Sequence, residues 1–107
     1  MWTVEYLPEV EKDFKSLGRN DIILVNKAIL KVAQNPLPKS EGGYGEPLGN
    51  KMGRNLTGLF KIKLRGPGIR VVYKLQKADQ EMLIVVIGIR EDEEVYNIAF
   101  NKSKRHF

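Results

Sequence analysis

The sequence predicts a single α+β domain in which helices pack on an antiparallel sheet. Apolar side chains recur at helical spacing in the first third of the chain, and from residue 60 onward the spacing changes to alternation. The chain has 107 residues, which suits one domain spanning residues 1–107. Hydrophobic residues make up 42% of it and charged residues 29%, a balance typical of a folded core rather than of disorder.

The N-terminal third predicts a strand and a helical hairpin. Residues 2–6 alternate and contain several strand formers. Apolar side chains then follow at helical spacing up to Gly18, which suits a helix C-cap, and again after Asn20, which suits a helix N-cap. The second helix is expected to end before Pro36, because the residue before a proline avoids helical geometry. The short linker between the helices predicts an antiparallel hairpin.

The middle of the chain predicts a long loop and three strands. Residues 35–56 are rich in proline and glycine, and we expect a surface loop that is a tolerated insertion rather than a lid. Strands follow over 60–65 and 69–75, each with one apolar and one polar face. The continuous apolar run 82–89 predicts a central strand covered on both faces.

The C-terminal segment predicts one helix with a loose end. Residues 91–94 are acidic, which is favourable in the first turn of a helix, and the helical pattern continues through Ala99. The basic residues at 101–107 are predicted to fray.

Composition excludes several classes of site. The chain has no cysteine, so it holds no disulfide, zinc–thiolate site or cysteine nucleophile. Its one histidine, His106, lies in the predicted tail, and no acidic cluster has metal-ligand spacing, so we expect no metal and no cofactor. No apolar run is long enough to cross a membrane and no secretion signal precedes the first strand. We therefore expect a cytoplasmic protein without a membrane partner.

The positive charge is concentrated in one stretch. The formal net charge is +5. Residues 51–77 carry eight basic side chains and no acidic one, while the segments on either side are mildly acidic. Like charges on neighbouring strands repel, and a phosphate backbone would offset that repulsion. The pattern favours nucleic-acid binding over the alternative, a merely solvated outer face.

Strand alternation predicts which of these side chains share a surface. Neighbouring antiparallel strands share their faces, so one surface is expected to collect the polar side chains Lys61, Lys63, Arg65, Arg70 and Lys74. We expect Arg90 at the end of this surface, because it shares the alternation parity of Ile84, Val86 and Gly88. Gly88 either leaves room for a ligand or marks a bulge.

Catalysis by this chain would have to use lysine, arginine, tyrosine or carboxylate groups. A neighbouring like charge disfavours the charged form of a lysine, so Lys61 or Lys63 could act as a base near neutral pH. Tyr96 falls in the C-terminal helix, where the alternative to a functional role is core packing or surface amphipathicity. Tyr73 lies in the apolar register of its strand and is predicted to be core.

Four segments carry a family resemblance: NLTGLFKIKLR at 55–65, GIRVVY at 68–73, GIR at 88–90 and EVY at 94–96. Taken in this order and spacing, they resemble the bacterial RelE toxins of the RelE/ParE toxin–antitoxin superfamily. The N-terminal strand and the two helices that follow it agree as well, so the resemblance covers nearly the whole chain. It implies the RelE/ParE-like variety of the α+β fold.

The resemblance implies an activity and a set of partners. The activity is that of a type II toxin, a metal-independent endoribonuclease that cleaves messenger RNA in the ribosome and so inhibits translation. The ribose 2′-hydroxyl would attack the adjacent phosphate, leaving a 2′,3′-cyclic phosphate and a 5′-hydroxyl. The implied partners are a cognate antitoxin, mRNA and the ribosome with its 16S rRNA.

The resemblance also implies residue roles. Lys61 and Lys63 match the family's lysine pair, for base work and phosphate contact. Arg70 matches the arginine that stabilises the pentacoordinate phosphate, and Arg90 matches the one that protonates the leaving oxygen. Tyr96 matches the tyrosine that orients the reacting nucleotide. Arg65 matches a basic position that contacts RNA or the ribosome, and we expect further RNA contacts from Lys74, Lys51 and Arg54.

Two departures from the family pattern leave alternatives open. Residues 91–94 put four acids beside Arg90, and segment 35–56 is longer than the compact family pattern. One alternative is a ParE-like toxin that binds DNA gyrase and is not a nuclease, although that branch generally lacks the lysine pair combined with the later arginine and tyrosine. The other alternative is an inactive RNA-binding remnant that keeps the fold.

Overall fold

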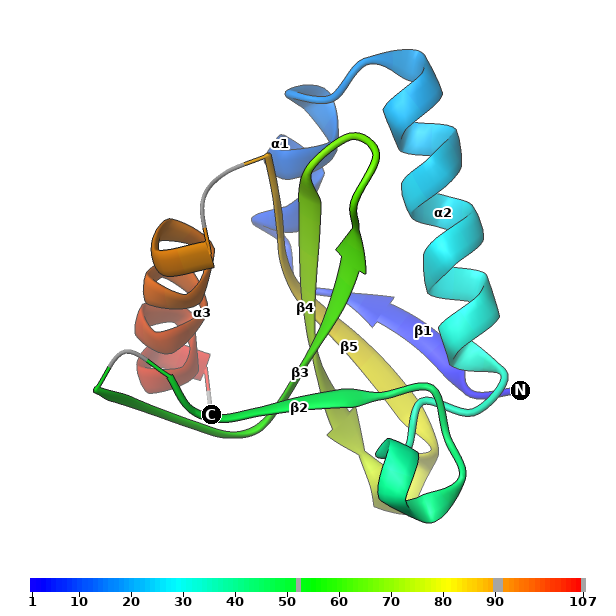
Figure 1. Cartoon of the computed structure of the whole chain (residues 1–107), viewed down its shortest axis with the longest axis vertical. Helices are drawn as coiled ribbons and strands as arrows, with labels where there is room; N and C mark the ends of the chain where they lie inside the picture. The colour runs from blue at the N-terminus through cyan, green and yellow to red at the C-terminus, as the bar shows by residue number, and fades with distance from the viewer. Residues whose placement is uncertain (52, 90–91, 107) are drawn as a thin grey trace.

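The computed structural model describes residues 1–51, 53–89 and 92–106. Within these residues five strands form one sheet in the order β1-β5-β4-β3-β2 (Figure 1). The strands are β1 (Thr3–Tyr6), β2 (Glu46–Lys51), β3 (Arg54–Leu64), β4 (Ile69–Gln76) and β5 (Glu81–Gly88). The helices are α1 (Val10–Lys15), α2 (Arg19–Ala33) and α3 (Asp92–His106), with short 3-10 helices η1 (Lys39–Glu41) and η2 (Lys77–Asp79). The predicted α+β class is confirmed.

The sheet is mixed rather than wholly antiparallel. β1 runs parallel to β5, with Thr3 opposite Glu81, whereas the other neighbouring strands are antiparallel. The predicted meander is the β3–β4–β5 part, whose strands are joined by short turns. β1 can pair with β5 in parallel because the helices α1 and α2 and the strands β2, β3 and β4 separate the two in the chain, so no tight turn dictates the direction of β1.

Helices cover both faces of the sheet. Figure 1 shows α2 along one side and α3 along the other. α3 packs on β3, β4 and β5, and α1 packs on β5. This double cover explains why residues 82–87 are all buried, as predicted for a central strand. Residues 71–73 are buried as well, although their strand was predicted to have one polar face. Each large apolar side chain buried here contributes about 1.5–3 kcal/mol, so β4 and β5 form the centre of the core.

Tyr73 belongs to this core, as its register predicts. It is fully buried, and its ring stacks on Phe60 with the centroids 5.2 Å apart. Its hydroxyl donates a hydrogen bond to the Pro36 carbonyl at 2.9 Å. Burial, with a smaller contribution from the Glu46 charge, raises the pKa of Tyr73. The residue therefore ties β4 to the segment that follows α2.

The junction between the first two helices differs from the prediction. α1 ends at Lys15 with Ser16 as its C-cap, so Gly18 does not cap it. Gly18 is instead the N-cap of α2: it is extended, and its carbonyl accepts the Ile22 amide at 3.0 Å. Because this first helical hydrogen bond already forms at Gly18, Asn20 lies inside the helix and is not its cap.

The C-terminal tail, which was predicted to fray, is helical over its described residues 101–106. α3 continues to His106, whose Nε2 lies 2.9 Å from Glu9 Oε1. One turn earlier, the Lys102 ammonium donates to the Val85 carbonyl at 2.8 Å and is only 5% exposed. Both contacts are with residues that are distant in the sequence. The composition of the tail therefore could not predict them.

Much of the predicted 35–56 loop is sheet. β2 pairs with β3, and β3 begins at Arg54 rather than at residue 60. Leu48 and Leu56 are 3% and 1% exposed, so this part of the sheet contributes to the core. Proline and glycine are tolerated because β2 is an edge strand, and the ladder is irregular between Pro47 and Gly49.

Candidate functional site

The central strands bring four cationic side chains to one face of the sheet. In the β3–β4 ladder Lys63 lies opposite Arg70, Lys61 opposite Val72 and Leu59 opposite Lys74. Directly opposed residues share a face. We name this set the basic face, and its members are Lys61, Lys63, Arg70 and Lys74. Lys63 is exposed, whereas the other three side chains are half-buried.

Arg65 is not placed on this face by the ladder. The last paired residues of the two strands are Leu64 and Ile69, and Arg65 is an exposed residue of the turn that follows. Alternation had predicted that it continues the face, but alternation holds only while the strand does. Arg65 therefore lies beyond the end of the basic face.

The far end of the face meets β5 at a glycine. Arg70 lies opposite Gly88, so no side chain separates the guanidinium from that part of β5. The ladder shifts register between Val72 and Tyr73, which puts Val86 on the face of Val72 and Ile84 on the opposite one. The expected common parity of Ile84 and Gly88 is therefore wrong. The expectation for Arg90 lies outside the described residues.

Tyr96 is part of the packed interior. It sits in α3, which lies against β3, β4 and β5, and its side chain is 2% exposed. This agrees with core packing, one of the two readings without a functional role. A ring this buried does not present a face on which a nucleotide could stack, so the predicted orienting role stays a prediction.

Arg54 and Lys51, two further residues predicted to bind RNA, are not part of the basic face. Arg54 lies at the start of β3, about 23 Å from Lys61 at the usual rise along a strand. It is half-buried and opposite Lys51. The side chain of Lys51 lies outside what the structure describes. Arg54 is thus not brought together with the four cations.

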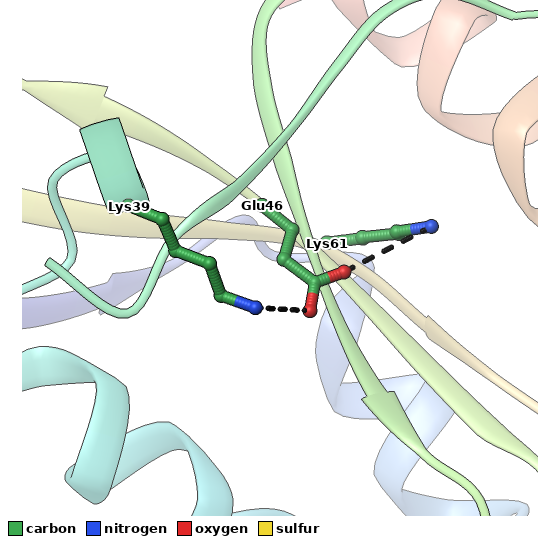
Figure 2. Close-up of polar contacts among 3 residues, drawn as sticks. All are labelled: Lys39, Glu46 and Lys61. Atoms are coloured by element: carbon green, nitrogen blue, oxygen red, sulfur yellow. Dashed lines mark hydrogen bonds and ion pairs between the residues drawn. The ribbon is translucent and has the colours of Figure 1, made fainter.

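One acidic residue at the basic face was missed by the sequence analysis. Glu46, the first residue of β2, lies directly opposite Lys61. Its Oε1 lies 3.0 Å from Lys39 Nζ and its Oε2 lies 4.0 Å from Lys61 Nζ (Figure 2). The hydrogen bond from Lys39, with smaller contributions from the charges of Lys61 and Lys63, lowers the pKa of Glu46. Nothing in a proline- and glycine-rich segment signals this pairing.

A pocket of about 280 Å³ lies at the end of β5, where it is lined also by Asp13 of α1 and by Val95 and Ile98 of α3. Gly88 borders it, which agrees with the expectation that this glycine leaves open space. The one charged group lining it in the described part of the chain is Asp13, and a carboxylate repels phosphate. The pocket is therefore a poorer phosphate site than the basic face.

Two further findings concern the described residues alone. No three histidine, cysteine, aspartate or glutamate side chains come together there as metal ligands would. No helix among them has the length and apolarity needed to span a bilayer.

Known proteins resemble this chain in sequence. No protein-family model matches it. The mRNA interferase toxin RelE of Escherichia coli strain K12 is 28% identical over 91 residues, which cover 85% of this chain and 85% of that protein. A RelE-like toxin protein of E. coli is 35% identical over 51 residues, 48% of this chain, and the match spans 54% of that relative's length.

Solved structures agree in fold. A mutant of the E. coli RelE toxin in the free state aligns with a TM-score of 0.73 at 24% identity, covering 99% of this chain and 98% of that one. The chain thus shares the fold of the E. coli RelE toxin and is similar to it in sequence. The RelE-type fold is also seen in the intact E. coli RelBE toxin–antitoxin complex, with a TM-score of 0.64 at 21% identity over 85% of this chain and 99% of that one.

Proposed function

We propose that this RelE-type protein is the toxin of a type II toxin–antitoxin system and an endoribonuclease that cleaves mRNA during translation. The observation that carries the proposal is the basic face, on which Lys63 and Arg70 lie opposite each other on adjacent strands. The curated relative from E. coli strain K12 is an mRNA interferase, which supports the same activity here. The proposed site of action is the cytoplasm, on mRNA held by the ribosome and its 16S rRNA.

The basic face suits cleavage by an internal nucleophile. In the proposed reaction the ribose 2′-oxygen attacks the adjacent phosphorus, and the bond to the 5′-oxygen breaks. The proton of the 2′-hydroxyl passes to a base and the leaving oxygen receives a proton, giving a 2′,3′-cyclic phosphate and a 5′-hydroxyl. Negative charge accumulates on the phosphate as it becomes pentacoordinate, and fixed cations aimed at it lower the barrier.

Each residue of the proposed site has a chemical role. Arg70 offers a planar guanidinium, which binds two phosphate oxygens at once. Lys61 and Lys63 supply the phosphate contact and the base. Arg90, proposed to protonate the leaving oxygen, lies outside the described residues. Tyr96 is proposed to orient the nucleotide, which requires α3 or its neighbours to move, because the ring is buried.

The proposed partner that restrains the toxin is a cognate antitoxin. The E. coli RelBE structure is a toxin–antitoxin complex of the same fold, which supports such a partner for this chain. An antitoxin that covers the basic face would block access of RNA, and an acidic segment would complement its charge.

Brief expression in bacteria followed by mapping of mRNA 5′ ends tests the function. We expect new cuts within translated reading frames for the wild type, reduced about 10²–10³-fold in Arg70→Ala because one fixed cation is removed from the transition state. Lys27→Ala, an exposed lysine of α2, serves as the control and should cut like the wild type. Toxicity with supercoiling defects and no cuts would contradict the proposal and favour a gyrase-binding toxin. Absence of toxicity would favour an inactive remnant.

A further inference from the structure

Lys61 is the enclosed member of the lysine pair. Its side chain is 18% exposed, whereas Lys63 is exposed to solvent. A charged side chain that is largely shielded from water is costly unless a counter-charge lies near it. Lys63 and Arg70 on the same face are cations and increase that cost. The counter-charge is Glu46, directly across the β2–β3 ladder.

The two lysines that flank Glu46 contact it differently. Lys39 approaches one carboxylate oxygen to 3.0 Å, which is hydrogen-bond distance. Lys61 lies 4.0 Å from the other oxygen, which is too far for a hydrogen bond but close enough for strong attraction. Glu46 thus stabilises the charge of Lys61 without using its N–H donors. A lysine ammonium has three of these donors, and they are left for a phosphate.

The segment before β2 holds this arrangement in place. The amides of Tyr44 and Gly45 donate to the carbonyls of Asn35 and Leu37, each at 2.9 Å, and the Lys39 amide donates to Gly45 at 3.0 Å. A Cβ at Gly45 would lie 2.7 Å from both the Pro36 carbonyl oxygen and the Tyr73 hydroxyl, so only glycine fits. The segment is an ordered frame, and Lys39 and Glu46 emerge from it in set positions.

We propose that Glu46, anchored by Lys39, is a positioning residue that holds the Lys61 ammonium in place for the phosphate of the RNA. The inference rests on the proposed nuclease function. It adds to the site two residues from outside β3 and β4, Lys39 and Glu46. It also gives segment 35–45 a task, in place of the tolerated insertion that its composition predicts.

The physical consequence is preorganisation. With Glu46 in place, the Lys61 ammonium is held beside the phosphate site before RNA arrives, and no free energy is spent ordering it in the transition state. Without the carboxylate, repulsion from Lys63 and Arg70 favours conformers in which Lys61 turns toward solvent. The loss should therefore fall on the chemical step rather than on binding to the ribosome.

Single-turnover cleavage of a defined mRNA on translating ribosomes separates these two effects. The rate is measured over a range of protein concentrations, giving the saturating rate and the half-saturating concentration for the wild type, Glu46→Gln and Glu46→Asp. Glu41→Gln is the matched control, because it removes the same charge from an exposed position of the same segment. Thermal unfolding of each variant checks that the fold is kept.

We expect Glu46→Gln to lower the saturating rate about tenfold and to change the half-saturating concentration less than about twofold. Glu46→Asp keeps the charge and should recover to within about threefold of the wild type, and Glu41→Gln should match the wild type. The inference is overturned, with the nuclease function intact, if Glu46→Gln saturates at the wild-type rate or if Glu46→Asp is as slow as Glu46→Gln. A wild-type protein that does not cleave would overturn both.

Discussion

The basic face and the outer edge of β5 use the same kinds of side chain in opposite ways. At the β5 edge, Lys102 donates to the Val85 carbonyl at 2.8 Å, and Asp13 Oδ2 accepts the Ile87 amide at 3.0 Å. Both charges satisfy backbone groups where β1 no longer pairs with β5. On the basic face, Lys63 is exposed and forms no ion pair with any residue that the structure describes.

The difference separates stability from function. A charge that completes buried hydrogen bonds stabilises the fold, since the backbone groups it serves would otherwise be unsatisfied. A cluster of cations on a surface opposes folding through mutual repulsion and is retained where a ligand supplies the opposite charge. Substitutions on the basic face should therefore change mRNA cleavage, and substitutions at the β5 edge should change stability. The variants described next test this expectation.

The largest effect is expected for Lys63→Met. Cleavage of mRNA should fall about 10²-fold or more, because a side chain proposed to contact the phosphate or act as base is lost. The melting temperature should stay the same or rise slightly, since repulsion between residue 63 and Arg70 is removed. Cleavage assays and thermal unfolding on one preparation test both statements. A clear loss of stability would show that Lys63 is structural after all.

Lys102→Met should produce the opposite outcome. It leaves the Val85 carbonyl without its donor, so the free energy of unfolding in urea should fall by about 1–3 kcal/mol. Cleavage per folded molecule should be kept within a few-fold. Lys104→Met, at an exposed position two residues on, is the control and should change stability by less than about 0.5 kcal/mol. Equal stability of the two variants would contradict the role of Lys102 at the β5 edge.

Lys39→Met tests an ion pair at the β2 edge of the sheet, beside the basic face. The pKa of Glu46 is lowered in the folded protein, mainly by the hydrogen bond from Lys39. The stabilisation is therefore present above the ordinary glutamate pKa of about 4.3 and is lost as the pH falls through the lower folded value. Because Glu46 is 42% exposed, the effect should be below about 1 kcal/mol.

Urea unfolding at pH 7 and near pH 3 measures this effect. The wild type should exceed Lys39→Met in stability at pH 7, and the gap should close at the lower pH. Lys27→Met, whose side chain is exposed on α2, should show no gap at either pH. A gap that persists in acid would mean that Lys39 stabilises the protein through something other than the Glu46 carboxylate.

Prediction from the sequence succeeded where the signal was local. The alternation over 60–65 and 69–75 placed Lys61, Lys63 and Arg70 on one face, and the ladder confirms it. The same reasoning failed where a strand ended, at Arg65, and where β4 and β5 shift register, at Ile84. It also missed β2, because composition rich in proline and glycine conceals an edge strand.

The sequence by itself determined the α+β class, the central strands and the surface that carries the cations, because side-chain periodicity is a property of neighbouring residues. Only the tertiary structure decided that Lys102 is buried while Lys63 is exposed to solvent, and that Glu46 lies opposite Lys61. Those outcomes depend on which segments distant in the chain pack together. The charge, burial and hydrogen-bond partners of a side chain follow from that packing, and they determine whether a lysine stabilises the fold or faces a ligand.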